Sequence, residues 1–272
     1  MTATATAVEG PGHDLDRTLD LLETAEACRW HMSDLPWGEI DDSLVDEELI
    51  GYVRRAALTE MTTWEATQRF MTSFADDVDF TQWIAVWFYE ETKHPQALMR
   101  WLEHFGVTLT AGEMMAARQT QPFVGSRSGT LAINVIAETI ASAGYQRLAS
   151  LTREPVLRTI TTNLARDEGR HASGFYVFLD RELARSADPA RERRMILMVL
   201  YVWFHHRSRL KHPGMLLQRD LTEQTYDDPE QLADDPAIVA RLCRLFAEVL
   251  GEPDLHCPSD LRTILRRGTG RR

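Results

Sequence analysis

Four long stretches of helical periodicity constrain the fold of this sequence more than any other feature. Apolar residues recur in them at three- and four-residue steps, which is typical of helices with one buried face. No Asn-Gly or Asp-Gly turn separates alternating apolar runs, so strands are not expected. Short loops join the first two stretches and the last two, and short connections make antiparallel neighbours. We therefore predict an all-α protein in which two helical hairpins form a four-helix bundle, with long helices at residues 44–74, 79–105, 127–150 and 153–185.

Shorter helical patterns flank and connect these stretches. They predict additional helices at residues 15–32, 111–118, 189–211, 229–250 and 259–267. Glycine and proline mark the ends, as at Gly106 and at Pro213-Gly214. Residues 1–13 are small and polar, which predicts a disordered arm. We expect a single helical domain over residues 14–250, followed by a C-terminal helix and basic tail over residues 251–272.

Composition excludes several classes of function. The longest apolar run, from Met195 to Phe204, is about half of what a bilayer span needs, so no membrane span is expected. The N-terminus lacks the basic start and apolar core of a signal peptide. Three scattered cysteines (Cys28, Cys243 and Cys257) favour reduced thiols and a cytoplasmic protein. The net charge of -11 argues against a nucleic-acid partner, because phosphate binding needs clustered Lys and Arg.

The chemical signal of the sequence is a Glu-x-x-His pair that occurs twice, where composition alone gives about 0.7 pairs. Glu91 and His94 follow the apolar run 83–89, and Glu168 and His171 lie between apolar residues on both sides. Residues three apart share a helical face, so each pair can bind one metal ion. A carboxylate buried in such surroundings is unfavourable unless it is paired or bound to a cation.

One further glutamate stands on each of the other two long helices. Glu60 precedes Glu91 by 31 residues, and Glu138 precedes Glu168 by 30. Matched spacing of this kind brings positions in the two arms of a hairpin to the same level. Taken alone, Glu91 with His94 is more often a pair on a helix surface, Glu138 more often faces a polar cleft or another subunit, and Glu168 could belong to a solvated ion-pair ladder. Together, four carboxylates and two imidazoles predict a site for two iron or manganese ions.

The two motifs resemble those of the ferritin-like di-iron carboxylate superfamily, most closely the soluble acyl-carrier-protein desaturases. Residues 90–94 read Glu-Glu-Thr-Lys-His and residues 167–171 read Asp-Glu-Gly-Arg-His, where those desaturases show Glu-Glu-x-Arg/Lys-His and Asp-Glu-x-Arg-His. The resemblance covers about residues 28–211. It implies a ferritin-like bundle with additional N- and C-terminal helices. It also implies six iron ligands, namely Glu60, Glu91, His94, Glu138, Glu168 and His171.

The resemblance also implies roles beside the metals. Asp167 would hold a ligand imidazole, and Trp30 would relay electrons, with Trp37 as the alternative. Two positions depart from the family pattern: Pro95 stands where a glycine is common, and Ala141 where a threonine is common. The proline removes a helix hydrogen bond to the Glu91 carbonyl and is expected to kink the helix beside the metals.

The activity expected from this resemblance is an O₂-dependent di-iron oxidase or desaturase of fatty acid metabolism. It would abstract hydrogen from an acyl chain, which an acyl carrier protein would present. An external donor such as ferredoxin would supply electrons, O₂ would be the co-substrate, and the chain would form a homodimer. Residues 181–219 hold nine basic and three acidic residues, a net charge of +6 that suits an acidic carrier. A substrate channel could be lined by aromatic and methionine side chains, although any one of them taken alone is more often part of an ordinary core: Trp64, Trp87, Phe88, Met99, Phe175, Tyr176 and Phe178.

Two alternatives stay open. One is a di-iron oxygenase that hydroxylates or N-oxidises a small metabolite in specialised biosynthesis. Leu164 stands where arylamine N-oxygenases of the superfamily carry an extra histidine, which disfavours that particular subfamily. The other alternative is an iron store related to ferritin. The helices predicted before residue 44 and after residue 190 disfavour it, because they resemble substrate and partner surface.

Overall fold

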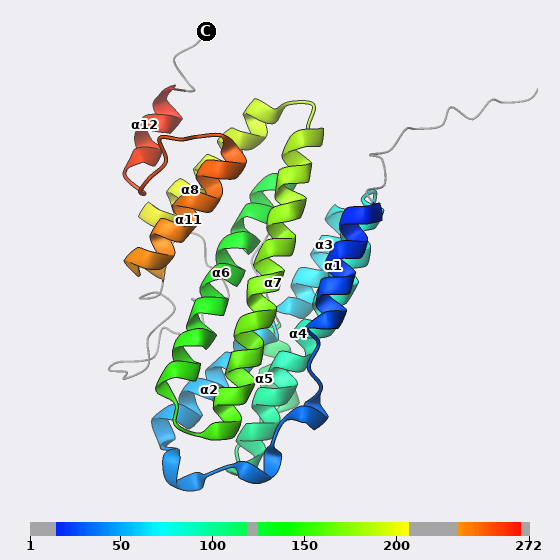
Figure 1. Cartoon of the computed structure of the whole chain (residues 1–272), viewed down its shortest axis with the longest axis vertical. Coiled ribbons are helices and arrows are strands. Elements are labelled where there is room, and N and C mark those ends of the chain that lie inside the picture. The colour runs from blue at the N-terminus through cyan, green and yellow to red at the C-terminus, as the bar shows by residue number, and fades with distance from the viewer. Residues whose placement is uncertain (1–14, 119–124, 207–232, 268–272) are drawn as a thin grey trace, which may run out of the picture.

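The computed structural model describes residues 15–118, 125–206 and 233–267 (Figure 1). Within these ranges all regular structure is helical and no strand is found, which confirms the all-α prediction. The bundle consists of α2 and α3 in succession (Glu47–Glu60 and Thr63–Ser73), α4 (Val78–His104), α6 (Arg127–Leu151) and α7 (Pro155–Arg185). Helices α6 and α7 pack together along their length, and α2 and α3 pack against α4, as expected for two hairpins.

The prediction of one continuous helix over residues 44–74 is wrong. The helix stops after Glu60, turns at residues 61–62 and resumes at Thr63. At the break, the amides of Met61 and Thr62 bond to carbonyls three residues back instead of four. The hydroxyls of Thr62 and Thr63 bond to the carbonyls of Thr59 and Glu60. These local bonds compete with the regular helical pattern, which explains why a threonine-rich segment breaks here.

Side-chain caps set the start of each long helix. Asp77 accepts the amide of Phe80 at the start of α4, and Ser126 accepts that of Gly129 at the start of α6. Glu154 accepts two amides at the start of α7, where Pro155 occupies the first helical position. Gly106, with φ of 72°, ends the turn that follows α4. These caps place the helix ends next to short loops, so α3 and α4, and α6 and α7, run antiparallel.

The remaining helices cover the bundle. Helix α1 (Leu15–Ala27) lies against α4 and ends five residues before the predicted end at residue 32; short 3₁₀ turns follow from Met32 onward. The others are α5 (Ala111–Ala117), α8 (Pro189–His206), α11 (Pro236–Leu250) and α12 (Asp260–Arg267). The predicted arm 1–13, most of the basic tail and the helix ends predicted between residues 207 and 232 lie outside the described residues. None of the described helices is long and apolar enough to cross a bilayer.

Two apolar cores lie at different levels of the bundle. One is rich in aromatic rings and joins residues 80–87 of α4 to residues 131–140 of α6 and 175–183 of α7. The other joins residues 97–102 of α4 to residues 145–148 of α6 and 156–165 of α7. Residues 90–94 and 167–171 fall between the two cores. The two Glu-x-x-His motifs therefore form a polar layer enclosed by apolar packing at both ends.

Candidate metal centre

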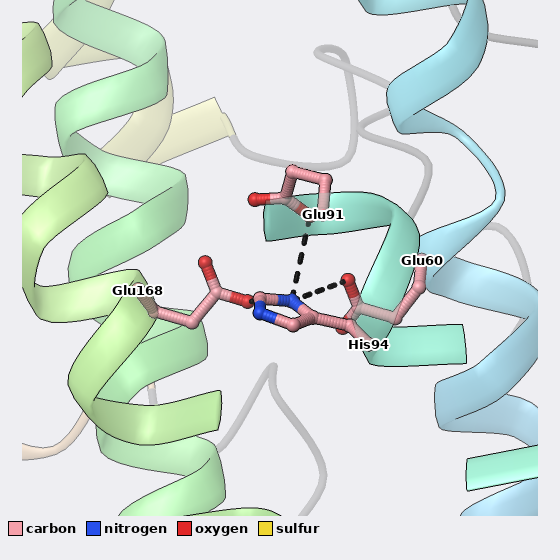
Figure 2. A group of neighbouring side chains, drawn as sticks. All are labelled: Glu60, Glu91, His94 and Glu168. Atoms are coloured by element: carbon pink, nitrogen blue, oxygen red, sulfur yellow. Dashed lines mark ion pairs between the residues drawn. The ribbon is translucent and has the colours of Figure 1, made fainter. Parts of the chain in front are cut away.

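All six predicted ligands lie in this polar layer. Glu60 is the last residue of α2, Glu138 comes from the middle of α6, and α4 and α7 each supply one Glu-x-x-His pair. Each side chain is buried, with between 0% and 8% of its surface exposed. Figure 2 shows Glu60, Glu91 and Glu168 arranged around the ring of His94. The matched spacing in the two hairpins and the apolar neighbours of these residues in the sequence predicted that the six side chains lie close together.

The ligand atoms fall into two overlapping groups, each of which could hold a metal ion. Within a group, one nitrogen or carboxylate oxygen from every residue lies within 4.8 Å of the others. The groups share Glu91 and Glu168, so each of these two carboxylates could contribute to both sites. The first group is Glu60, Glu91, His94 and Glu168, and the second is Glu91, Glu138, Glu168 and His171.

The His94 imidazole is oriented for metal binding. Its Nε2 lies 3.2 Å from Asp167 Oδ2, so we assign the ring proton to Nε2. Its Nδ1 lies 3.3 Å from Glu168, 3.5 Å from Glu91 and 3.6 Å from Glu60. This nitrogen is buried and has no hydrogen-bond partner. A buried lone pair facing three carboxylates fits a cation between them, and the donor set therefore accepts a metal.

His171 has a similar orientation, except that its Nδ1 is hydrogen-bonded to Glu168. Its Nε2 lies 3.0 Å from Glu90 Oε2. Its Nδ1 lies 2.9 Å from Glu91, 3.1 Å from Glu168 and 3.9 Å from Glu138. The first acid of each doublet therefore contacts the histidine of the other motif. This contact of Glu90 was not predicted, although its place before Glu91 matches that of Asp167 before Glu168.

Arg170 and Trp30 complete the surroundings of Asp167. Arg170 Nη2 bonds to Asp167 and, at 3.0 Å, to Glu90, so one guanidinium joins the two outer carboxylates. The buried Trp30 donates from Nε1 to Asp167 Oδ2 at 2.8 Å. Trp37 instead donates to the Met32 carbonyl. Of the two tryptophans named from the sequence, only Trp30 is hydrogen-bonded to Asp167.

Glu60 and Glu138, which each belong to one ligand group only, also have aromatic hydrogen-bond donors that were not predicted from the sequence. The Tyr145 hydroxyl donates to Glu60, and Trp87 Nε1 donates to Glu138 Oε1 at 3.2 Å. Tyr145 lies seven residues after Glu138, which is two helical turns and hence the same face. That spacing was the available signal. These bonds restrict how each carboxylate can rotate, so Tyr145 and Trp87 act as positioning residues.

The protonation of the layer reflects its excess of negative charge. Burial and the neighbouring Glu168 raise the pKa of Glu91 to about 8. Burial and the same neighbour raise the pKa of Glu138 well above its usual value. For Glu168, burial is outweighed by His94 and by bonds to His171, which lower its pKa. For both histidines, burial is outweighed by nearby carboxylates, which raise the pKa well above the usual value. Divalent cations would replace the protons that this cluster otherwise holds.

Helix α4 continues through the buried Pro95, and the kink expected there stays a prediction. Arg181 is buried between Asp77 and Asp79, which removes it from any basic surface. Residues 207–219 of the basic stretch lie outside the described residues. The exposed basic residues that remain in it are Arg185, Arg191, Arg193 and Arg194.

The donor set consists of carboxylates and imidazoles, without a thiolate. This combination suits iron and manganese. No family model matches the chain, and no curated protein matches it. The metal centre is therefore inferred from the positions of the side chains.

Proposed function

We propose that this chain is a non-haem di-iron oxidase that uses O₂ to abstract hydrogen from a substrate C–H bond. The observation that carries the proposal is the pair of ligand groups that share Glu91 and Glu168. Sharing two carboxylates would hold two ions close together, and His94 and His171 each turn Nδ1 toward these carboxylates. A single structural metal would need neither the second group nor the second oriented histidine.

Each residue of the layer has a proposed task. Glu60 and His94 would bind one ion, Glu138 and His171 the other, and Glu91 and Glu168 both. A bound iron pair would supply the reducing power that activates O₂. Asp167 and Glu90 would keep the ring protons of the two histidines on Nε2. Trp30 would pass electrons from an external donor such as ferredoxin through Asp167 toward His94, along contacts of 2.8 Å and 3.2 Å.

For the substrate, the resemblance to desaturases supports an acyl chain bound to a carrier protein. The exposed arginines at the end of α7 and on α8 support the same proposal, because an acidic carrier would be attracted to them. The homodimer that the resemblance implies belongs to this proposal as well.

A small-metabolite oxygenase is the second candidate, and one observation favours it. Three of the aromatic residues expected to line an acyl channel are packed into the core instead: Trp87, Phe175 and Phe178 are between 0% and 3% exposed. Phe175 lies 5.7 Å from Trp87 and 4.9 Å from Trp83 between ring centroids. Rings packed this closely leave no room for an alkyl chain among them. A compact substrate would not need that space.

Anaerobic titration with Fe(II) tests the metal centre. We expect about two irons per chain, and we expect Glu138→Ala to abolish the binding of the second. Glu103→Ala is the matched control, because Glu103 is an exposed acid on α4, outside the layer. Saturation of the native protein at one iron or none would reject the proposal. Consumption of O₂ by the reduced, iron-loaded protein then tests the oxidase step.

Mass spectrometry of products separates the two substrate classes. The reduced, iron-loaded protein would be given acyl carriers and small amines under oxygen. An unsaturated or hydroxylated acyl product supports the first candidate, and an oxidised small metabolite supports the second. Oxygen consumption without an organic product from either panel would contradict both and favour an iron-oxidising protein.

A further inference from the structure

A groove of about 710 Å³ lies between α1, α4 and α7, on the outer side of the metal centre. Leu21 and Ala25 of α1 line it together with Trp83 and Val86 of α4. The two motifs contribute Glu90, Arg170 and His171. Its volume falls within the range of small-molecule sites, about 300–1,000 Å³. The proposed oxidation assigns no role to this groove.

The lining of the groove carries an excess of positive charge. Three arginines line it, Arg29, Arg166 and Arg170, whereas Glu90 is its one acidic lining residue. Glu90 is already bonded to both His171 and Arg170. The whole chain has a net charge of -11, so three arginines at one groove run against its general character. A local field of this sign attracts anions.

Two of these guanidinium groups have unmet hydrogen-bonding capacity. Nε of Arg29 and Nε of Arg170 are both buried and have no partner. The Arg29 guanidinium lies 5.0 Å from the centre of the Tyr89 ring. Among the described residues, no carboxylate forms an ion pair with Arg29 or Arg166. A buried N–H without an acceptor is unfavourable, so an acceptor supplied by a ligand would be stabilising.

We propose that this groove binds a small organic monocarboxylate with an apolar body. A carboxylate can accept two parallel hydrogen bonds from a guanidinium, which fits Arg29, whose Nε lacks an acceptor. The exposed Arg166 adds a second cation to the lining. The apolar body would lie against Leu21, Ala25 and Val86 and the ring of Trp83. Glu90 and the His171 ring stand between the groove and the inward Nδ1 of His171. The ligand would therefore contact the outer side of the metal centre and not the ions, so the proposal does not depend on iron.

Calorimetric titration of the full chain tests the proposal, with hexanoate as the probe and 1-hexanol and hexyl phosphate as comparisons. We expect hexanoate to bind in both the metal-free and the iron-loaded protein, and more tightly than either comparison. Arg29→Gln and Arg166→Gln should each weaken binding by about 10-fold, the typical effect of losing one charged hydrogen bond. Arg158→Gln is the matched control, an exposed arginine on α7 two turns before Arg166.

A third variant tests the location without changing charge. Thr24→Trp places a large ring at an exposed position that lines the groove, and it should abolish hexanoate binding while leaving the melting temperature near that of the native protein. Absence of hexanoate binding, equal binding of 1-hexanol, or tighter binding of hexyl phosphate would each overturn the proposal. Iron stoichiometry measured on the same variants should stay at about two per chain, which separates failure of this site from failure of the metal centre.

Discussion

Replacing Asp167 by Asn tests whether the outer carboxylates determine how the histidines bind metal. Asp167 is fully buried, and its Oδ2 accepts from Trp30 Nε1 at 2.8 Å and from His94 Nε2 at 3.2 Å. Its Oδ1 accepts from Arg170. Burial raises the pKa of Asp167, but the His94 bond and the charges of His94 and Arg170 outweigh it and lower the pKa to about 2. The carboxylate is therefore the charged partner of the His94 ring.

Asparagine fills the same volume but has one acceptor oxygen where aspartate has two. If the amide oxygen faces Trp30 and His94, the amide NH₂ faces the Arg170 guanidinium, donor against donor. If the amide is turned over, Arg170 keeps its acceptor while Trp30 and His94 lose theirs. Either orientation also removes the negative charge beside His94. Loss of such a partner reduces metal affinity by about 10–100-fold, or ~1.4–2.7 kcal/mol.

Anaerobic Fe(II) titration in competition with a chelator resolves the affinity of each of the two ions. We expect Asp167→Asn to weaken the ion bound by His94, and Glu90→Gln to weaken the ion bound by His171. Asp20→Asn, the same chemical change at an exposed position of α1, should alter neither affinity. Far-UV circular dichroism confirms that the variants are folded. If Asp167→Asn binds both ions within about twofold of the native affinity, the argument that Asp167 orients His94 is refuted.

Three further predictions concern stability. Gly174→Ala should destabilise the fold by about 1–3 kcal/mol in urea denaturation, despite the higher helix propensity of alanine. The added Cβ would overlap the ring of Trp83. Gly169→Ala is the control and should not destabilise the fold, because the atom nearest to its Cβ would be Ser142 Oγ at 3.5 Å. Arg181→Met should cost about 3–5 kcal/mol by removing the guanidinium from two buried carboxylates, and equal stability of Arg181→Met and the exposed control Arg191→Met would contradict this. Metal-free protein should melt at progressively lower temperature as pH rises from about 5 to about 8. Burial and Glu168 raise the pKa of Glu91 to about 8 in the folded state, whereas the unfolded chain releases this proton near 4.5. A melting temperature that stays constant or rises with pH in the presence of EDTA would contradict this sign.

The periodicity of the long segments predicted the bundle because apolar residues at three- and four-residue steps form one face of a helix, and that face packs against its neighbours. Helix α7 was predicted at residues 153–185 and is found at Pro155–Arg185, with Glu154 and Pro155 at its start. The break after Glu60 was not predicted, because threonines fit a helical pattern as well as a helix end. Only the backbone positions decide whether Thr62 and Thr63 bond locally to carbonyls or leave the helix intact.

The sequence predicted the six candidate ligands but not all of the residues that form hydrogen bonds to them. Glu60 and Glu138 were named because an acid within an apolar helix needs a partner and because their spacing to the two motifs matched. Trp87 carried no comparable signal, and Tyr145 carried only its seven-residue spacing from Glu138. A buried aromatic residue satisfies an apolar pattern whether or not its polar atom bonds to a ligand. The ligand roles and the activity stay predictions until metal binding is measured.

The contacts between the two motifs connect metal binding to assembly of the bundle. Glu90 of the first hairpin bonds to His171 of the second, and Asp167 of the second bonds to His94 of the first. Glu91 and Glu168 belong to both ligand groups, so neither group can form within one hairpin. An ion that binds either group therefore also stabilises the docking of α4 against α7. Because that docking brings together the shared carboxylates of the other group, binding of the first ion should prepare the site for the second.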